Sequence, residues 1–379
     1  MEHQSDDMIR DQFSEKFTEA GRDIGRFNLA IFGKTGVGKS TLVNAIFGEV
    51  VAKTGIGSPV TEGSHLYMHV SGHFGALDTR GLEIGKDNSI ILRDLEQYVR
   101  EMRKSSLPEQ LHIAWYCVRA SDRRFEDTEE AFIRALVRLG LPVLLVFTQV
   151  SMRSGQYHPD AIELISAIRD RDLPLRGELP FFTYAKADEF AGLEPHGLHE
   201  LLNATFRIAP EGVRAALTAA QKIDVKRKHD AAIKAISAAA AAAAAVGATP
   251  IPFSDAVILV PIQLGMMARV SHIYDIDIEN ASTAALASAA AATTTGRNLV
   301  TGLIKLVPGI GSVVGGAIAA GTAFAITLAV GQAWVVVFAR ISQGQLSLIS
   351  GLLDREAIRE VFMAEFKKNI RKHLLGSGS

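Results

Sequence analysis

The chain has 379 residues and a formal net charge of −1. This length is enough for two domains, and the near-neutral charge gives no general attraction to nucleic acid, so we expect no nucleic-acid partner. A single cysteine, Cys117, excludes an internal disulfide framework and is typical of a reducing compartment. Cys117 lies in an apolar run, and we expect it to be a buried residue of a strand.

Residues 1–26 predict one polar, amphipathic helix. Its apolar side comprises Met8, Ile9, Phe13, Phe17 and Ile24. The start of the chain is polar and acidic, without the basic-then-apolar order of a signal peptide. We therefore expect a cytoplasmic protein.

Strand and helix patterns alternate over residues 27–207. The expected strands are 27–32, 65–70, 74–77, 113–118, 143–147 and 181–184. The expected helices are 40–47, 89–102, 127–139, 160–169 and 198–209. Continuous apolar strands separated by helices predict an α/β fold with a mostly parallel sheet that is covered on both faces. In such a sheet, ligands bind outside the carboxyl ends of the strands.

Residues 33–40 read Gly-Lys-Thr-Gly-Val-Gly-Lys-Ser, a complete G-x-x-x-x-G-K-[ST] phosphate-binding loop between a predicted strand and a predicted helix. Its glycines allow backbone N–H groups to surround phosphates. Lys39 is expected to reach the β- and γ-phosphates, and the Ser40 hydroxyl to hold Mg²⁺. The helix N-terminus adds positive potential. The nucleotide-binding residues predicted here are Lys34, Thr35, Gly36, Val37, Gly38, Lys39, Ser40 and Thr41.

Asp78 follows a predicted strand and begins the sequence Asp-Thr-Arg-Gly, which ends at Gly81. An acidic residue at a strand end can hold Mg²⁺ through water, and the Gly81 N–H can contact the γ-phosphate. A threonine of the Gly-rich segment 55–61 can close onto Mg²⁺ when the γ-phosphate is present. We predict Thr61 in this role, with Thr54 as the alternative. The predicted metal-binding residues are Ser40, Thr61 and Asp78.

On these motifs, residues 27–207 resemble the G domain of translation-factor-type small GTPases, near the Era-like and septin/AIG-like groups. Gly36 stands where potassium-activated Era-like members carry Asn, so the loop is more similar to septin, AIG and immunity-related GTPases. The resemblance implies that the chain binds GTP or GDP with Mg²⁺ and hydrolyses GTP.

The base-reading motif departs from this family. Family members carry Asn/Thr-Lys-x-Asp after the fifth strand, and the Asp binds the guanine N1 and N2 hydrogens. Here the residues are Thr148, Gln149, Val150 and Ser151, with no carboxylate. Ala185 and Lys186 resemble the Ser-Ala-Lys loop that lends backbone contacts to the base. We expect Thr148, Gln149, Ala185 and Lys186 to bind the nucleotide, with moderate selection of GTP over ATP.

Catalysis shows a second departure. Leu82 occupies the position at which small GTPases often carry a water-orienting Gln, so we expect slow hydrolysis. The candidate activating residues are Arg80, Glu83, Arg123 and Arg124, together with Thr61 and Gly81 at the γ-phosphate. An arginine donated across a homodimer of G domains could neutralise charge in the transition state. The alternative is that Arg123 and Arg124 are surface residues without a catalytic role.

The second half of the chain, residues 208–375, predicts an all-α domain rich in Ala and Gly. A charged connecting helix is expected at 210–235, followed by helical segments at 238–245, 257–270 and 281–292. The final Gly-Ser-Gly-Ser, 376–379, resembles an artificial linker and is excluded from the fold.

Residues 306–339 contain no charged residue. This run is long enough to span a bilayer, and its glycines have the small-residue spacing of helices that pack in lipid. Pro308, Gln332 and Thr327 favour the alternative of buried helices in a soluble bundle. Residues 230–345 resemble the domain of unknown function of YcjF-type bacterial membrane proteins, on residues 246–255 and 307–311.

Three functions remain open from the sequence. The first is a GTPase switch coupled to a helical domain that contacts lipid, at or in the cytoplasmic membrane. The second is a soluble GTPase whose apolar helical domain mediates oligomer or partner assembly. The third is a nucleotide-gated effector that permeabilises membranes.

Overall fold

The structure is a computed structural model. It describes residues 2–48, 57–61, 64–79, 88–176, 180–247, 255–291, 317–346 and 353–375. The chain divides into two compact units, which are described separately below. The sheet unit is Ile24–Val225, and the helical unit consists of Met1–Asp23 and Lys226–Ser379.

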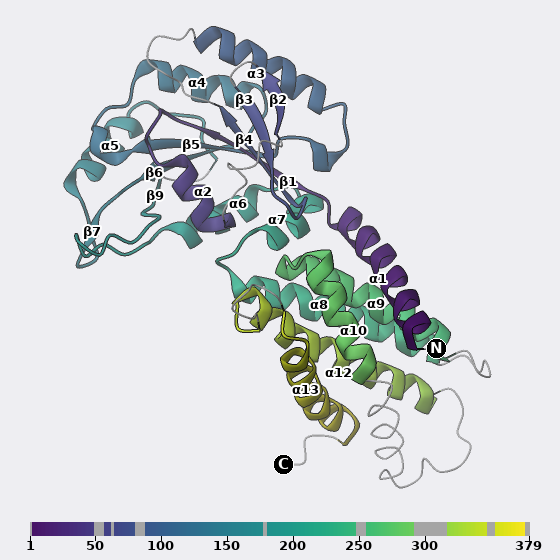
Figure 1. The fold of residues 1–379 in the computed structure, drawn as a ribbon. Helices are drawn as coiled ribbons and strands as arrows, with labels where there is room; N and C mark the ends of the chain where they lie inside the picture. Colours follow the sequence, from purple (N-terminus) through teal and green to yellow (C-terminus); the bar gives the residue numbers. More distant parts are fainter. Residues whose placement is uncertain are drawn as a thin grey trace. The chain divides into compact units, whose positions relative to one another are not determined.

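The described residues of the sheet unit form one seven-stranded sheet in the order β2-β3-β4-β1-β5-β6-β9 (Figure 1). Five strands are parallel, while β2 and β3 are antiparallel at one edge. The predicted mostly parallel sheet is therefore confirmed. The strands are β1 (Phe27–Phe32), β2 (Gly57–Thr61), β3 (Ser64–Met68), β4 (Phe74–Thr79), β5 (Ile113–Arg119), β6 (Val143–Thr148) and β9 (Phe181–Phe182). A separate hairpin joins β7 (Met152–Arg153) to β8 (Gln156–Tyr157).

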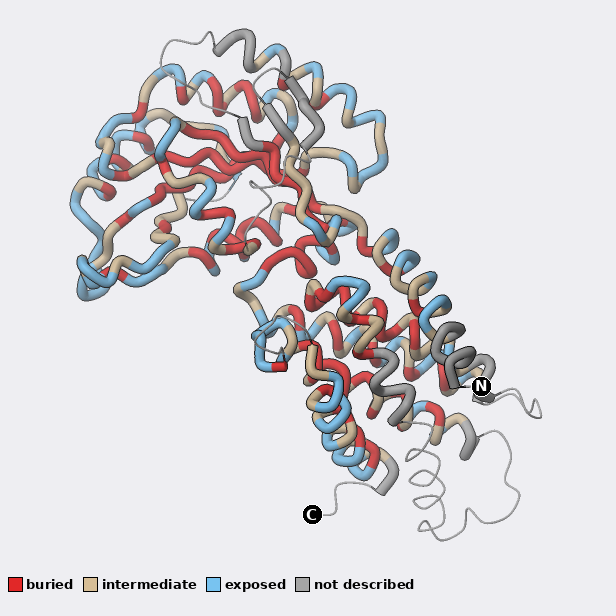
Figure 2. Tube along the Cα trace, in the orientation of Figure 1, coloured by how far each residue is buried: buried red, intermediate tan, exposed pale blue. Residues whose placement is uncertain are grey.

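Helices cover both faces of the sheet (Figure 1). Alternate residues of the central strands belong to the two opposite apolar layers. In β1, Leu29 and Ile31 pack on one layer, and Ala30 and Phe32 pack on the other. The first layer contains α2 (Lys39–Phe47), α6 (Leu198–Ile208) and α7 (Arg214–Ala220). The second contains α3 (Asn88–Met102), α4 (Asp127–Arg138) and α5 (Pro159–Arg169). Figure 2 shows the central strands buried between them.

The end of the sheet unit differs from the expected connecting helix at 210–235. A short 3₁₀ turn at Glu211–Val213 leads into α7, and the next long helix begins only at Val225. Val213, Ala216 and Leu217 are fully buried in the layer with α2 and α6. The boundary that we expected between residues 207 and 208 therefore lies inside the sheet unit.

The helical unit joins the N-terminal helix to the second half of the chain. Its helices are α1 (Glu2–Ile24), α8 (Val225–Gly247), α9 (Asp255–Tyr274), α10 (Ile278–Ala291), α12 (Ala317–Ser342) and α13 (Arg355–Leu375). One core contains Phe13 of α1, Met267 of α9 and Trp334 of α12. The His272 Nε2 of α9 donates to the Phe17 carbonyl oxygen at 2.8 Å, and the two rings lie 3.9 Å apart. The expected N-terminal helix thus belongs to the helical unit.

Helix α12 contains most of the charge-free run, and residues 306–316 lie outside the described part of the chain. It packs against α9 and α13, and at Gly331 it comes so close to α8 that a Cβ atom would lie 2.5 Å from Ile236 Cγ2. By length and composition, two described helical stretches could cross a membrane, Val225–Val246 and Ala320–Ser342. Much of the second is buried among the other helices.

Candidate functional site

The carboxyl edge of the sheet brings the predicted site segments together. Asp78 of β4 is paired with Ile31 of β1, two residues before the phosphate-binding loop. On the other side, β5, β6 and β9 end side by side, with Arg119 paired to Thr148. The loops that follow these parallel strands therefore meet at one edge, as expected for a ligand site in such a sheet.

The phosphate-binding loop depends on backbone that only glycine adopts readily. Gly33, Gly36 and Gly38 have φ angles of 133°, 80° and 91°. A Cβ atom on Gly33 would lie 2.2 Å from the Cys117 carbonyl oxygen of β5. Helix α2 begins at Lys39, directly after Gly38, so its free N–H groups and positive dipole end face the loop.

Lys39 is held inside this loop. Its Nζ donates to the carbonyl oxygens of Gly33 and Lys34, at 2.9 Å each. An ammonium group has three N–H donors, so one remains for an anion in the loop. Ser40 and Thr41, in the first turn of α2, are exposed. This arrangement fits a bound polyphosphate.

The side chain of Lys34 joins the loop to the start of α4. Its Nζ lies 2.8 Å from Glu126 Oε1 and 3.4 Å from Glu129 Oε2. Partial burial opposes the charge on Lys34, but the hydrogen bond to Glu126 and the two carboxylates outweigh it and raise the pKa of the ammonium. The same hydrogen bond lowers the pKa of Glu126. Glu129, which is buried, also accepts the Glu126 N–H and the Tyr116 hydroxyl.

Cys117 lies under the loop as a buried residue of β5, as predicted. Burial raises the pKa of its thiol to about 12. The thiol therefore remains neutral and acts as a small apolar side chain.

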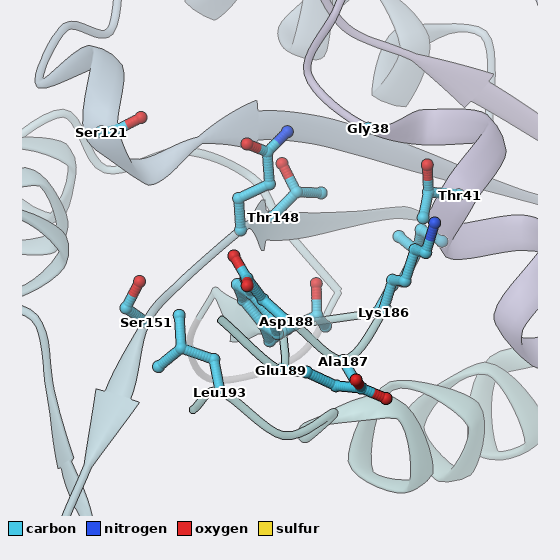
Figure 3. A pocket seen from close by; sticks show the side chains of 15 residues that line it. Gly38, Thr41, Ser121, Thr148, Ser151, Lys186, Ala187, Asp188, Glu189 and Leu193 are labelled. Atoms are coloured by element: carbon cyan, nitrogen blue, oxygen red, sulfur yellow. The ribbon is translucent and has the colours of Figure 1, made fainter. Parts of the chain in front are cut away.

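A cleft of about 730 Å³ continues from the phosphate-binding loop along the ends of β6 and β9 (Figure 3). This volume lies within the usual range for small-molecule sites. The cleft is lined by Gly38, Thr41, Leu42, Ser121, Thr148, Gln149, Ser151, Thr183, Tyr184, Ala185, Lys186, Ala187, Asp188, Glu189 and Leu193. The structure therefore brings the predicted residues Thr148, Gln149, Ala185 and Lys186 to one cleft.

Thr148 connects the two ends of this cleft. Its buried Oγ1 lies within hydrogen-bonding distance of two carbonyl oxygens, Val37 in the phosphate-binding loop and Val118 in β5. Gln149 has a φ angle of 55°, and its Nε2 lies 3.5 Å from the Gly36 carbonyl oxygen. The hydroxyl of Thr148 therefore positions the phosphate-binding loop against the carboxyl ends of β5 and β6.

Residues 28–149 match the family model described as 50S ribosome-binding GTPase. The chain contains a P-loop GTPase domain. Among curated proteins, none matches the chain significantly.

Several solved structures are similar to this GTPase domain. A probable GTP-binding protein engB is 17% identical, with a TM-score of 0.33, over 48% of this chain and 97% of that one. Era from Aquifex aeolicus, with GDP and AlF₄⁻, is 19% identical, with a TM-score of 0.32, over 49% of this chain and 58% of Era. A dimerisation-deficient variant of Toc33 from Arabidopsis thaliana is 16% identical, with a TM-score of 0.33, over 55% of this chain and 92% of that one.

The structure describes some of the remaining predicted residues of the GTPase domain and not others. The backbones of Thr61 and Thr79 end β2 and β4, and the pairing of both strands with β3 puts these two ends at the same edge of the sheet. Thr54, Arg80, Gly81, Leu82 and Glu83 lie outside the described residues.

The two candidate arginines of the GTPase domain have different surroundings. Arg123 Nη2 donates to Glu163 Oε2 at 2.7 Å, and its Nε lies 3.6 Å from Asp160 Oδ1. Arg124 is exposed, and within the described chain it has no recorded hydrogen bond or ion pair. Its charge contributes to the lowered pKa of Glu126, after the larger effect of Lys34.

Sequence reasoning missed four acidic residues of this site. Glu126 and Glu129 contact Lys34, and Asp188 and Glu189 line the cleft. Asp188 follows Ala185 and Lys186 in the loop after β9, and no local sequence pattern indicates that it reaches the cleft.

Proposed function

We propose that the chain is a guanine-nucleotide switch that binds GTP and GDP with Mg²⁺ and hydrolyses GTP slowly. The observation that carries the proposal is the phosphate-binding loop, which contains three glycines with positive φ and holds the Lys39 ammonium through the carbonyl oxygens of Gly33 and Lys34, at the start of α2. The backbone N–H groups of Lys34–Thr41 and the Lys39 side chain would bind the phosphates.

The same geometry fits a magnesium ion beside the phosphates. The exposed Ser40 hydroxyl, with Asp78 and Thr61 at the carboxyl edge, would hold it. Bound Mg²⁺ would neutralise charge that develops on the phosphate oxygens. Gly81 would contact the γ-phosphate in the same proposal.

The base would lie in the cleft between Gln149 and the loop of Ala185 and Lys186. Ser151 offers a hydroxyl where the family carries a carboxylate, so selection of guanine by this position would be weak. We propose GTP over ATP, with slow hydrolysis because Leu82 cannot orient water.

The helical unit would report the nucleotide state to a membrane. Its resemblance to the YcjF-type domain and its two apolar stretches support this part of the proposal. The alternative is a soluble GTPase in which this unit mediates assembly, and the burial of α12 among other helices favours it. A nucleotide-gated permeabilising effector is the third candidate.

The decisive experiment is titration calorimetry of GTP, GDP and ATP with Mg²⁺, using the wild-type chain and Lys39→Ala. We expect Mg²⁺-dependent binding by the wild type and its loss in the variant, because the variant lacks the cation that faces the phosphates. Equal affinity of both proteins for GTP would reject the assignment. Tighter binding of ATP than GTP would reject guanine selection alone.

A further inference from the structure

At the end of the cleft where we place the base, the segment after β6 contains no carboxylate, but the loop after β9 supplies carboxylates. Of the residues that line the cleft, two are acidic, Asp188 and Glu189. Both follow Lys186 in the loop after β9. Figure 3 shows Asp188 between Ser151 and Lys186, among the side chains that surround the cleft.

The loop holds Asp188 in a defined place. Its backbone N–H and carbonyl oxygen pair with those of Leu193, at 2.9 Å each. Its Oδ1 accepts the Ala191 N–H at 2.9 Å, which fixes the direction of the carboxyl group. Asp188 is half-buried, whereas Glu189 and Phe190 are exposed. Within the described chain, Oδ2 of Asp188 has no recorded partner, so it can accept a hydrogen bond from a ligand.

We infer that Asp188 is the residue that selects guanine in this chain. The inference rests on the proposed function, because it assumes that the base lies in this cleft. Guanine presents two donors on one edge, N1–H and the N2 amine, and a carboxylate accepts from them. Adenine presents the N1 acceptor on that edge, which a carboxylate repels. The selecting carboxylate thus comes from the loop after β9, and Ser151 occupies its usual place.

The test is the Asp188→Asn variant, with calorimetry of GTP, ATP and xanthosine triphosphate. Asparagine retains an oxygen that can accept the Ala191 N–H, so the loop keeps its turn. The amide nitrogen that replaces Oδ2 is a donor and cannot accept a hydrogen bond from the guanine N1–H or N2 amine. We therefore expect GTP affinity to fall by about 10- to 100-fold. Xanthine carries a carbonyl at C2, to which this amide can donate. We therefore expect xanthosine triphosphate to bind more tightly to the variant than to the wild type.

Two controls separate the possible outcomes. Glu194→Gln removes an exposed charge from the same loop, away from the residues that line the cleft, and we expect it to leave GTP affinity unchanged. ATP affinity that does not fall in Asp188→Asn would show that the phosphate-binding loop and the fold are intact, because the amide group no longer repels the adenine N1 acceptor. If the wild type binds GTP and Asp188→Asn binds GTP and xanthosine triphosphate as the wild type does, the inference is overturned. If the wild type binds no nucleotide at all, the proposed function fails before Asp188 is tested.

Discussion

Gly33 shows how one residue determines the distance between the phosphate-binding loop and the sheet. Its φ angle of 133° lies in a region that other residues avoid, and a Cβ atom would overlap the Cys117 carbonyl oxygen. The strand therefore turns directly over β5, and the Gly33 carbonyl oxygen is free to accept from Lys39. A single side chain at this position would displace the loop that binds phosphate.

At the same scale, the structure distinguishes the two candidate arginines. Arg123 forms ion pairs with Glu163 and Asp160 of its own chain. Arg124 is exposed and lies near Glu126, which forms an ion pair with Lys34 of the phosphate-binding loop. We predict that Arg124→Ala lowers GTP hydrolysis at high protein concentration by a large factor, since an arginine donated to a transition state is worth ~10³–10⁵-fold. Hydrolysis is measured as phosphate release over a range of protein concentrations.

Arg123→Ala is the matched control for this prediction. It removes an exposed ion pair, which contributes little because solvent screens it, and should leave the concentration dependence intact. A specific activity that does not change with wild-type concentration would contradict donation between two copies. Equal rates for the wild type and Arg124→Ala would contradict the role of this residue.

At the scale of elements, the close approach of α12 and α8 gives a prediction. A Cβ atom at Gly331 would lie 2.5 Å from Ile236 and 2.9 Å from Met266 Sδ, whereas Gly321 has nothing within 4 Å. Gly331→Val should lower the free energy of unfolding of the helical unit by about 1–3 kcal/mol through overpacking. Gly321→Val, on the same helix, should leave it nearly unchanged or raise it by a few tenths.

The measurement uses the two tryptophans, one in each unit. In a Trp115→Phe background, Trp334 remains and reports on the core of the helical unit, where it stacks on Phe338. Urea unfolding followed by its fluorescence gives the stability of that core. Equal midpoints for both glycine variants would show that α12 and α8 do not meet at Gly331.

The elements that the sequence predicted well are those with a local signal. Continuous apolar runs gave β1, β5 and β6 nearly to the residue. The segment Gly57–Thr61 has no such signal, because it contains Pro59 and forms a strand only by pairing at the sheet edge with β3. Likewise α7 is rich in alanine and is buried by its place under the sheet, which no local pattern reveals.

The site follows the same rule. The glycines and Lys39 of the phosphate-binding loop could be predicted because their chemistry is contiguous in sequence. Asp188 could not, because it reaches the cleft only through the path of its loop and the pairing with Leu193. The contacts of Lys34 with Glu126 and Glu129 join residues more than 90 positions apart and depend on how α4 packs on the sheet.

At the scale of the whole molecule, much of the apolar run of α12 is buried in the core of the helical unit. Contact of these buried residues with lipid would require that unit to open, and a nucleotide can drive this only if it binds the two forms with different affinity. We predict flotation with liposomes in one nucleotide state, comparing GDP, a non-hydrolysable GTP analogue and no nucleotide. Lys39→Ala, which should not bind nucleotide, should float equally under all three conditions.

The other outcomes of this measurement select among the alternatives. A monodisperse protein that floats under no condition supports the soluble assembly function. Release of a dye from the liposomes in one nucleotide state supports the permeabilising effector.

The hydrogen bond between His272 and Phe17 also bears on synthesis. These residues are 255 positions apart. Because ribosomes add about 5–20 residues per second, roughly 10–50 s pass between the synthesis of Phe17 in α1 and that of His272 in α9. All of the GTPase domain emerges in that interval and can fold first. The nascent chain therefore carries an amphipathic helix in which Phe13 and Phe17 lack their contacts with α9 until that helix has been synthesised.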